Sequence, residues 1–86
     1  MARKVARLGD LISHGGEIIE ASPNTWANGI RVARLDDQVE CNLHGLQRII
    51  TASTVAFANT RGIARLDDDI SCGAKIVTAS PNVWAG

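Results

Sequence analysis

A sequence block that occurs three times constrains the fold of this 86-residue chain more than any other feature. The block Val-Ala-Arg-Leu-Gly-Asp at 5–10 returns as Val-Ala-Arg-Leu-Asp-Asp at 32–37 and as Ile-Ala-Arg-Leu-Asp-Asp at 63–68. A second block follows each copy, at 21–27, 52–58 and 79–85. Because both blocks recur in the same order, we interpret the chain as three copies of one structural unit.

The three units span about 5–31, 32–62 and 63–86, and together they form a single domain over 1–86. Each unit is too short to bury an apolar face by itself, so we expect the three to share one core. An arrangement about a common axis is the simplest closed solution. An open solenoid is the alternative, but three short rungs would leave strand edges exposed.

The local pattern within each unit is typical of β-structure. Short β-branched segments at 17–20, 48–51 and 75–78, flanked by turn residues, predict strands. The Asn28-Gly29 dipeptide predicts a hairpin turn. No window of a dozen residues carries the apolar spacing of a helix. We therefore predict an all-β fold, a small pseudo-threefold domain of short β-hairpins.

The Cys and His residues fall on the repeat in a pattern typical of a metal site. His14, Cys41 and Cys72 each lie nine residues after the start of a unit, and His44 lies in an insertion that only the middle unit carries. A tetrahedron viewed along one bond has three equivalent corners and one unique corner, which matches this set. Zinc prefers four N and S ligands in that arrangement. We therefore predict a closed, structural metal site, with zinc favoured over iron.

Three other interpretations of these side chains stay open at this stage. The cysteines could be two buried free thiols beside ordinary histidines, or they could form a Cys41–Cys72 disulfide. Cys41 and His44 could also form the catalytic pair of a small hydrolase, which would require an open cleft and an uncoordinated thiol. A metal ion would supply the additional stabilisation that a domain of this size needs.

The charge balance argues against two classes of partner. Nine basic residues are matched by nine acidic residues, so the chain lacks the clustered cations that give nucleic-acid binders their affinity. The same balance argues against a polybasic membrane-surface protein. The longest apolar run, at 55–58, is far too short to cross a bilayer, and the first residues lack the apolar stretch of a secretory signal.

Two further repeated features have a structural interpretation. An Arg and an Asp three residues apart recur in every unit, and we expect each Asp to cap a turn and pair with its own Arg rather than face a partner. Trp26, Phe57 and Trp84 occupy the same place in the three units and are the chain's only aromatic residues. We expect them to pack in the core, with a role as interface anchors as the alternative.

A set of short segments recurs along the chain in a characteristic order and spacing. They are Ala-Arg-Leu-Gly-Asp at 6–10, His-Gly-Gly at 14–16, Ala-Ser-Pro-Asn at 21–24 and 79–82, Asn-Gly at 28–29, Cys-Asn-Leu-His-Gly at 41–45 and Ser-Cys-Gly-Ala at 71–74. In this order and spacing they resemble the PAAR-repeat family over essentially the full chain. The name-giving Pro-Ala-Ala-Arg reads Arg-Val-Ala-Arg at 31–34 and Gly-Ile-Ala-Arg at 62–65, and the middle unit has Ala-Ser-Thr-Val in place of a Ser-Pro turn.

The resemblance implies a cone of β-hairpins with zinc near its point, held by His14, Cys41, His44 and Cys72. The family site is often described with three His and one Cys, whereas this chain offers two of each. The implied function is a non-enzymatic tip that caps the trimeric β-helical spike of a contractile injection machine, one tip per trimer, and aids membrane puncture. Type VI secretion systems, phage tails and related particles carry such tips.

The resemblance also implies where the protein acts and what it meets. It would be made in the cytoplasm, assembled on the spike and delivered out through the apparatus, making transient contact with a target membrane. Secreted effectors are further expected partners, and nucleic acid is not. The alternative function is a zinc-stapled, β-rich binding module unrelated to injection.

Overall fold

The computed structural model describes residues 2–86, and the regular structure within them is entirely β. One three-stranded antiparallel sheet has the order β2-β5-β6, and three two-stranded antiparallel sheets pair β1 with β9, β3 with β4 and β7 with β8. The strands are β1 (Arg3–Lys4), β2 (Gly16–Ile18), β3 (Trp26–Ala27), β4 (Ile30–Arg31), β5 (Gln38–Cys41), β6 (Gly45–Arg48), β7 (Phe57–Ala58), β8 (Arg61–Gly62) and β9 (Trp84–Ala85). The predicted all-β fold is confirmed.

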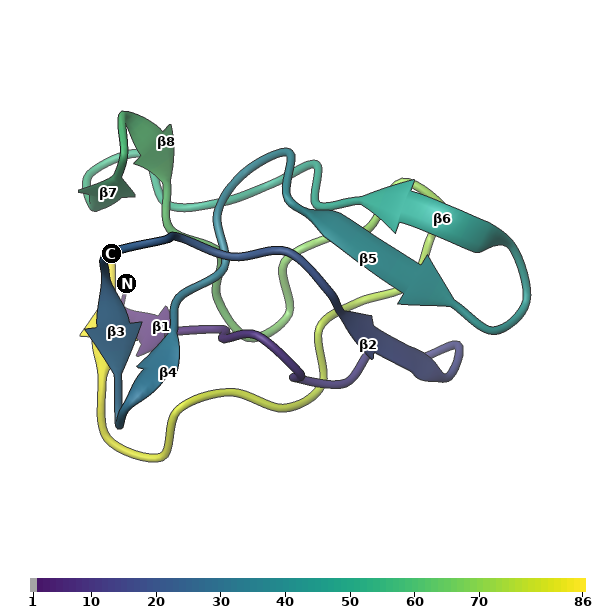
Figure 1. Ribbon diagram of the computed structural model, residues 1–86, viewed down its shortest axis with the longest axis horizontal. Coiled ribbons are helices and arrows are strands. Elements are labelled where there is room, and N and C mark those ends of the chain that lie inside the picture. Colours follow the sequence, from purple (N-terminus) through teal and green to yellow (C-terminus); the bar gives the residue numbers. More distant parts are fainter. Residues whose placement is uncertain (1) are drawn as a thin grey trace.

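The two kinds of sheet lie at opposite ends of the molecule. Figure 1 shows β2, β5 and β6 at one end and the three two-stranded sheets gathered at the other, together with both chain termini. The molecule measures 29 × 26 × 23 Å along its principal axes. Residues 2–86 include no helix with the length and apolar character that crossing a membrane requires.

A closed ring of backbone hydrogen bonds joins the three units at the repeated Ala-Arg blocks. The N–H of Ala6 donates to the carbonyl of Ala64, that of Ala64 to Ala33, and that of Ala33 back to Ala6, each at 2.9 Å. Three equivalent bonds can close on themselves only when the units surround a common axis. The structure therefore contains the closed, pseudo-threefold arrangement and not an open solenoid.

The two-stranded sheets occupy equivalent places in the three units. In the β3–β4 hairpin the turn residues Asn28 and Gly29 have φ of 55° and 75°, and in β7–β8 Asn59 and Thr60 have φ of 55° and 66°. Two consecutive positive φ values are typical of the type I′ turn, so the hairpin predicted at 28–29 is confirmed. The third sheet pairs β9 with β1 from the opposite end of the chain, which completes the ring.

The strands predicted at 17–20, 48–51 and 75–78 are only partly right. The first overlaps β2, and the second begins where β6 ends. Within the third, Lys75 and Ile76 form isolated bridges to Asp69 and Ile12 rather than a strand. The physical reason is that each segment passes from a partner in its own unit to a partner in the next unit, so pairing with any one partner lasts only one or two residues.

The core is built mainly from alanine, valine and isoleucine residues, most of them at equivalent positions of the repeat. Every member of the larger cluster is at most 3% exposed. The smaller cluster lies beside the two-stranded sheets and contains Val5, Val32 and the alanines of β3, β7 and β9. The larger cluster comprises Ala6, Ile12, Ile18, Ala33, Val39, Cys41, Ile49, Ala64, Ile70, Ala74 and Ile76.

The expectation that the aromatic residues pack in the core is wrong. Trp26, Phe57 and Trp84 are 57%, 58% and 54% exposed. Each is the first residue of a two-residue strand whose second residue is a buried alanine. Since successive side chains of a strand point to opposite faces, burying the alanine turns the aromatic ring outward.

The Arg–Asp pairs form the local structure expected from their spacing. The Asp37 carboxylate accepts hydrogen bonds from the backbone N–H, Nε and Nη2 of Arg34, at 2.8, 2.9 and 2.8 Å. A further bond comes from Nη2 of Arg61 at 2.9 Å. The pairs at 7/10 and 65/68 repeat the local pattern. The prediction of local pairing is confirmed. These bonds fix the turn near the start of each unit.

Gly16 occupies a place on β2 where no side chain fits. Its φ is 117°, and a Cβ there would lie 1.9 Å from the carbonyl oxygen of Glu40 on β5. We predict that Gly16→Ala lowers the free energy of unfolding by about 3 kcal/mol, because β2 and β5 must separate to admit the methyl group. Denaturant titration measures this loss.

Gly29→Ala provides the matched control for this substitution. Gly29 also has a positive φ, of 75°, but no atom lies within 4 Å of the position its Cβ would take. The cost there is limited to the left-handed backbone conformation, about 1–2 kcal/mol. Equal losses in the two variants would contradict a steric role for Gly16.

Candidate metal centre

Two turns of the same design carry His14 and Cys72. Two backbone hydrogen bonds close each turn, and one isoleucine makes both of them. In the first turn the N–H of Ile12 donates to the carbonyl of Gly16 and the N–H of Gly15 donates to the carbonyl of Ile12. Ile70, Ala74 and Gly73 make the same two bonds in the second turn. A glycine with positive φ follows the metal-capable residue in both, Gly15 at 79° and Gly73 at 91°. A residue without a Cβ adopts this conformation at little cost, which allows the chain to reverse directly after the functional side chain.

The middle unit builds its part of the site differently. Cys41 is the last residue of β5 and pairs with Gly45, the first residue of β6. His44 therefore lies in the turn between these two strands, within the insertion that only this unit carries. Because β5 is also paired with β2, Cys41 is held by hydrogen-bonded neighbours on both sides.

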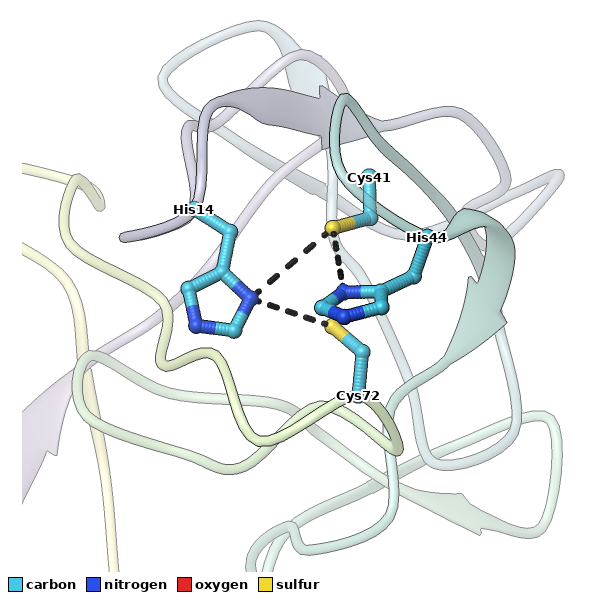
Figure 2. A group of neighbouring side chains, drawn as sticks. All are labelled: His14, Cys41, His44 and Cys72. Carbon is cyan, nitrogen blue, oxygen red and sulfur yellow. Dashed lines mark hydrogen bonds between the residues drawn. The ribbon is translucent and has the colours of Figure 1, made fainter.

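The structure brings all four sequence-predicted residues together. Figure 2 shows the side chains of His14, Cys41, His44 and Cys72 converging from three different segments. The Cys41 Sγ lies 3.9 Å from Nδ1 of His14 and 3.5 Å from Nδ1 of His44. The Cys72 Sγ lies 3.7 Å from Nδ1 of His14, and all four metal-capable atoms lie within 4.8 Å of one another.

These separations match those of a tetrahedral zinc site. Zinc binds sulfur at about 2.3 Å and imidazole nitrogen at about 2.0–2.1 Å, so an S···N edge of the tetrahedron measures about 3.6 Å. The three measured S···N distances, 3.5, 3.7 and 3.9 Å, scatter around that value. The donor set of two thiols and two imidazoles also suits zinc. The group is therefore able to hold a metal ion once its more widely separated atoms, which lie within 4.8 Å of one another, draw closer together.

Cys41 is only 2% exposed, whereas the hydrolase alternative requires a thiol that opens into a cleft. A groove does exist elsewhere, lined by Leu35, Ile50 and Phe57 among others, but neither cysteine lines it. Both cysteines are free, so the alternative of a disulfide is not what the structure contains.

A sequence profile of the PAAR motif matches residues 8–78, which is most of the chain and includes every residue of the cluster. The chain belongs to the PAAR family. The PAAR family is one of structural spike-tip proteins, and the cluster described above is consistent with a PAAR metal site. A search of curated proteins found no match to the chain.

In this PAAR protein the neighbours of the Cys41 thiol favour its deprotonated form. Burial raises the pKa of the Cys41 thiol, but hydrogen bonds with the His44 ring, the backbone N–H groups of Leu43 and His44, and the Cys72 thiol outweigh that effect. The balance lowers the pKa from the ordinary 9.0 to about 6. The thiolate, which is the form that binds metal ions, therefore predominates at neutral pH.

Proposed function

We propose that this PAAR protein is the non-enzymatic tip of a contractile injection machine, stabilised by a structural zinc ion and seated on a trimeric β-helical spike. The observation that carries the proposal is the division of the molecule into two ends (Figure 1). One end gathers four metal-capable side chains from three units. The other end presents one exposed aromatic residue from each unit.

The metal end supplies mechanical cohesion. His14 belongs to the first unit, Cys41 and His44 to the second, and Cys72 to the third. Zinc bound there would supply four bonds that join the three units at one point. All four side chains would be used as ligands, which leaves no coordination position for a substrate and favours a structural role over catalysis. Pulling the units apart would then require breaking metal bonds as well as weak contacts.

The opposite end has the features of a docking surface for a threefold partner. Trp26 in β3, Phe57 in β7 and Trp84 in β9 occupy equivalent strands and are each more than half exposed. Large exposed aromatic residues are common anchors of protein interfaces. Their pseudo-threefold arrangement offers three similar contacts to the three chains of a spike, which supports one tip per trimer.

This docking surface is tested by replacing the three aromatic residues with serine together. We expect the affinity for the cognate spike trimer to fall at least about a hundredfold, since three interface anchors are lost. Titration calorimetry measures the affinity. The melting temperature is expected to change little, because the rings contribute to no buried cluster.

Leu43→Ser is the control for the loss of exposed apolar surface. Leu43 is 69% exposed, but it lies in the β5–β6 turn at the metal end. Its replacement should leave spike binding unchanged. Full binding by the triple variant would overturn the proposed surface. Failure of the unmodified protein to bind its spike would favour the zinc-stapled binding module.

The proposal also includes the location of the protein and its other partners. The protein would be made in the cytoplasm, assembled on the spike and carried out with it, meeting the target membrane only transiently. Effectors would be further partners, while the balanced charge of the chain gives no reason to add nucleic acid.

A further inference from the structure

We propose that Cys41 and Cys72 form a reversible oxidation site, at which a peroxide converts the two thiols into a disulfide and thereby removes the metal-binding group. The formation of the disulfide depends only on these two residues. Its consequence for the metal rests on the structural metal site of the proposed function.

The two thiols are placed for such a reaction. Both are free, they come from different units, and their sulfur atoms lie within 4.8 Å of each other. A disulfide requires the sulfur atoms to approach to about 2.05 Å. Cys41 is held within the three-stranded sheet, whereas Cys72 lies in a turn outside the strands and precedes Gly73. The turn that carries Cys72 is therefore the part that moves.

The difference in burial sets the order of events. Cys72 is partly exposed and Cys41 is buried, so the oxidant meets Cys72 first. The Cys72 sulfur attacks one oxygen of hydrogen peroxide, the O–O bond breaks, and a sulfenic acid and water result. The Cys41 sulfur then attacks the Cys72 sulfur, the S–S bond forms, and the S–OH oxygen leaves as a second water. Two thiols and one peroxide yield one disulfide and two waters.

Oxidation removes two of the four metal-binding side chains at once. Metal ions bind the thiolate, and neither sulfur of a disulfide can supply one. Only His14 and His44 are left, which is too few for a closed tetrahedral site. The second thiol is the feature that makes this possible, because a site with a single cysteine has no internal partner for a sulfenic acid.

The test uses the full chain as purified, with its zinc content measured first. The protein is exposed to one equivalent of hydrogen peroxide, zinc release is followed with a chromogenic chelator, and the disulfide is located by peptide mapping. We expect one zinc ion released per Cys41–Cys72 disulfide formed. Adding a dithiol reductant should restore zinc binding.

Cys72→His is the matched variant, because it retains four metal-capable side chains but only one thiol. Its zinc release under the same treatment should be at least about tenfold slower. Zinc release without this disulfide, or equal release from Cys72→His, would overturn the proposal, as would complete resistance of both thiols. If Cys72→His does not fold, the peptide map of the unmodified protein decides alone. Spike binding plays no part in this test, so its outcome is independent of the docking proposal.

Discussion

Treatment with a strong chelator is expected to lower the melting temperature of this PAAR protein by more than about 20 °C, by removing the zinc ion that we propose for the cluster. Structural zinc contributes about 10–16 kcal/mol in small zinc domains, which is comparable with the whole stability of a typical domain, about 5–15 kcal/mol. The four residues of the cluster come from all three units, so loss of the ion would remove a link between the units. Thermal melting followed by circular dichroism, with and without a strong chelator, measures the effect.

Restoration by added zinc is the first control on this experiment. The second compares two substitutions: Cys72→Ser should reduce zinc affinity far more than Asp69→Asn, because Asp69 lies outside the cluster and pairs with Lys75. Unchanged melting in excess chelator would show that the cluster is not a structural metal site. Equal effects of the two substitutions would show that the ligand assignment is wrong.

Asp37→Ala is expected to lower the free energy of unfolding by about 3–5 kcal/mol. Asp37 is fully buried, and its carboxylate accepts bonds from both Arg34 and Arg61. Removing it leaves the nearly buried Arg34 guanidinium without its counter-charge, which is the costly way to break a buried ion pair. Denaturant titration measures the loss.

Asp69→Asn also serves as the matched control for Asp37→Ala. Its ion pair with Lys75 is exposed, with side chains 43% and 56% accessible. An exposed pair contributes less than about 1 kcal/mol, so this variant should be close to the unmodified protein. Similar losses in the two aspartate variants would contradict the structural role assigned to the buried pair.

Several parts of the fold could be predicted from the sequence because they depend on neighbouring residues. The Asn28-Gly29 turn requires two positive φ values, which this dipeptide favours. The Arg–Asp pairs need only a separation of three residues to close their turns. The sequence did not predict the equivalent turn at Asn59-Thr60, because threonine seldom adopts positive φ. Thr60 adopts it here because the rest of the unit fixes the β7–β8 hairpin.

The grouping of His14, Cys41 and Cys72 was also predictable, since residues at one position of a closed repeat must lie around its axis, and His44 follows Cys41 by only three residues. The structure places His14, Cys41, His44 and Cys72 together as expected. That they bind a metal ion remains a prediction, which the chelation experiment tests. Which ring nitrogen faces the thiols depends on side-chain packing, and the structure shows that Nδ1 does so in both histidines.

By itself, the sequence determined the repeat, the β character and the set of residues on the axis, because these follow from local pattern and from the identity of the three units. Only the tertiary structure decided which side of each short strand is buried. That choice turned the three aromatic rings outward, at the end away from the cluster. The physical reason is that burial of a side chain depends on residues contributed by other units. The pairing of β1 with β9, which closes the ring, is one such contribution, and the local sequence pattern of a strand does not contain this information.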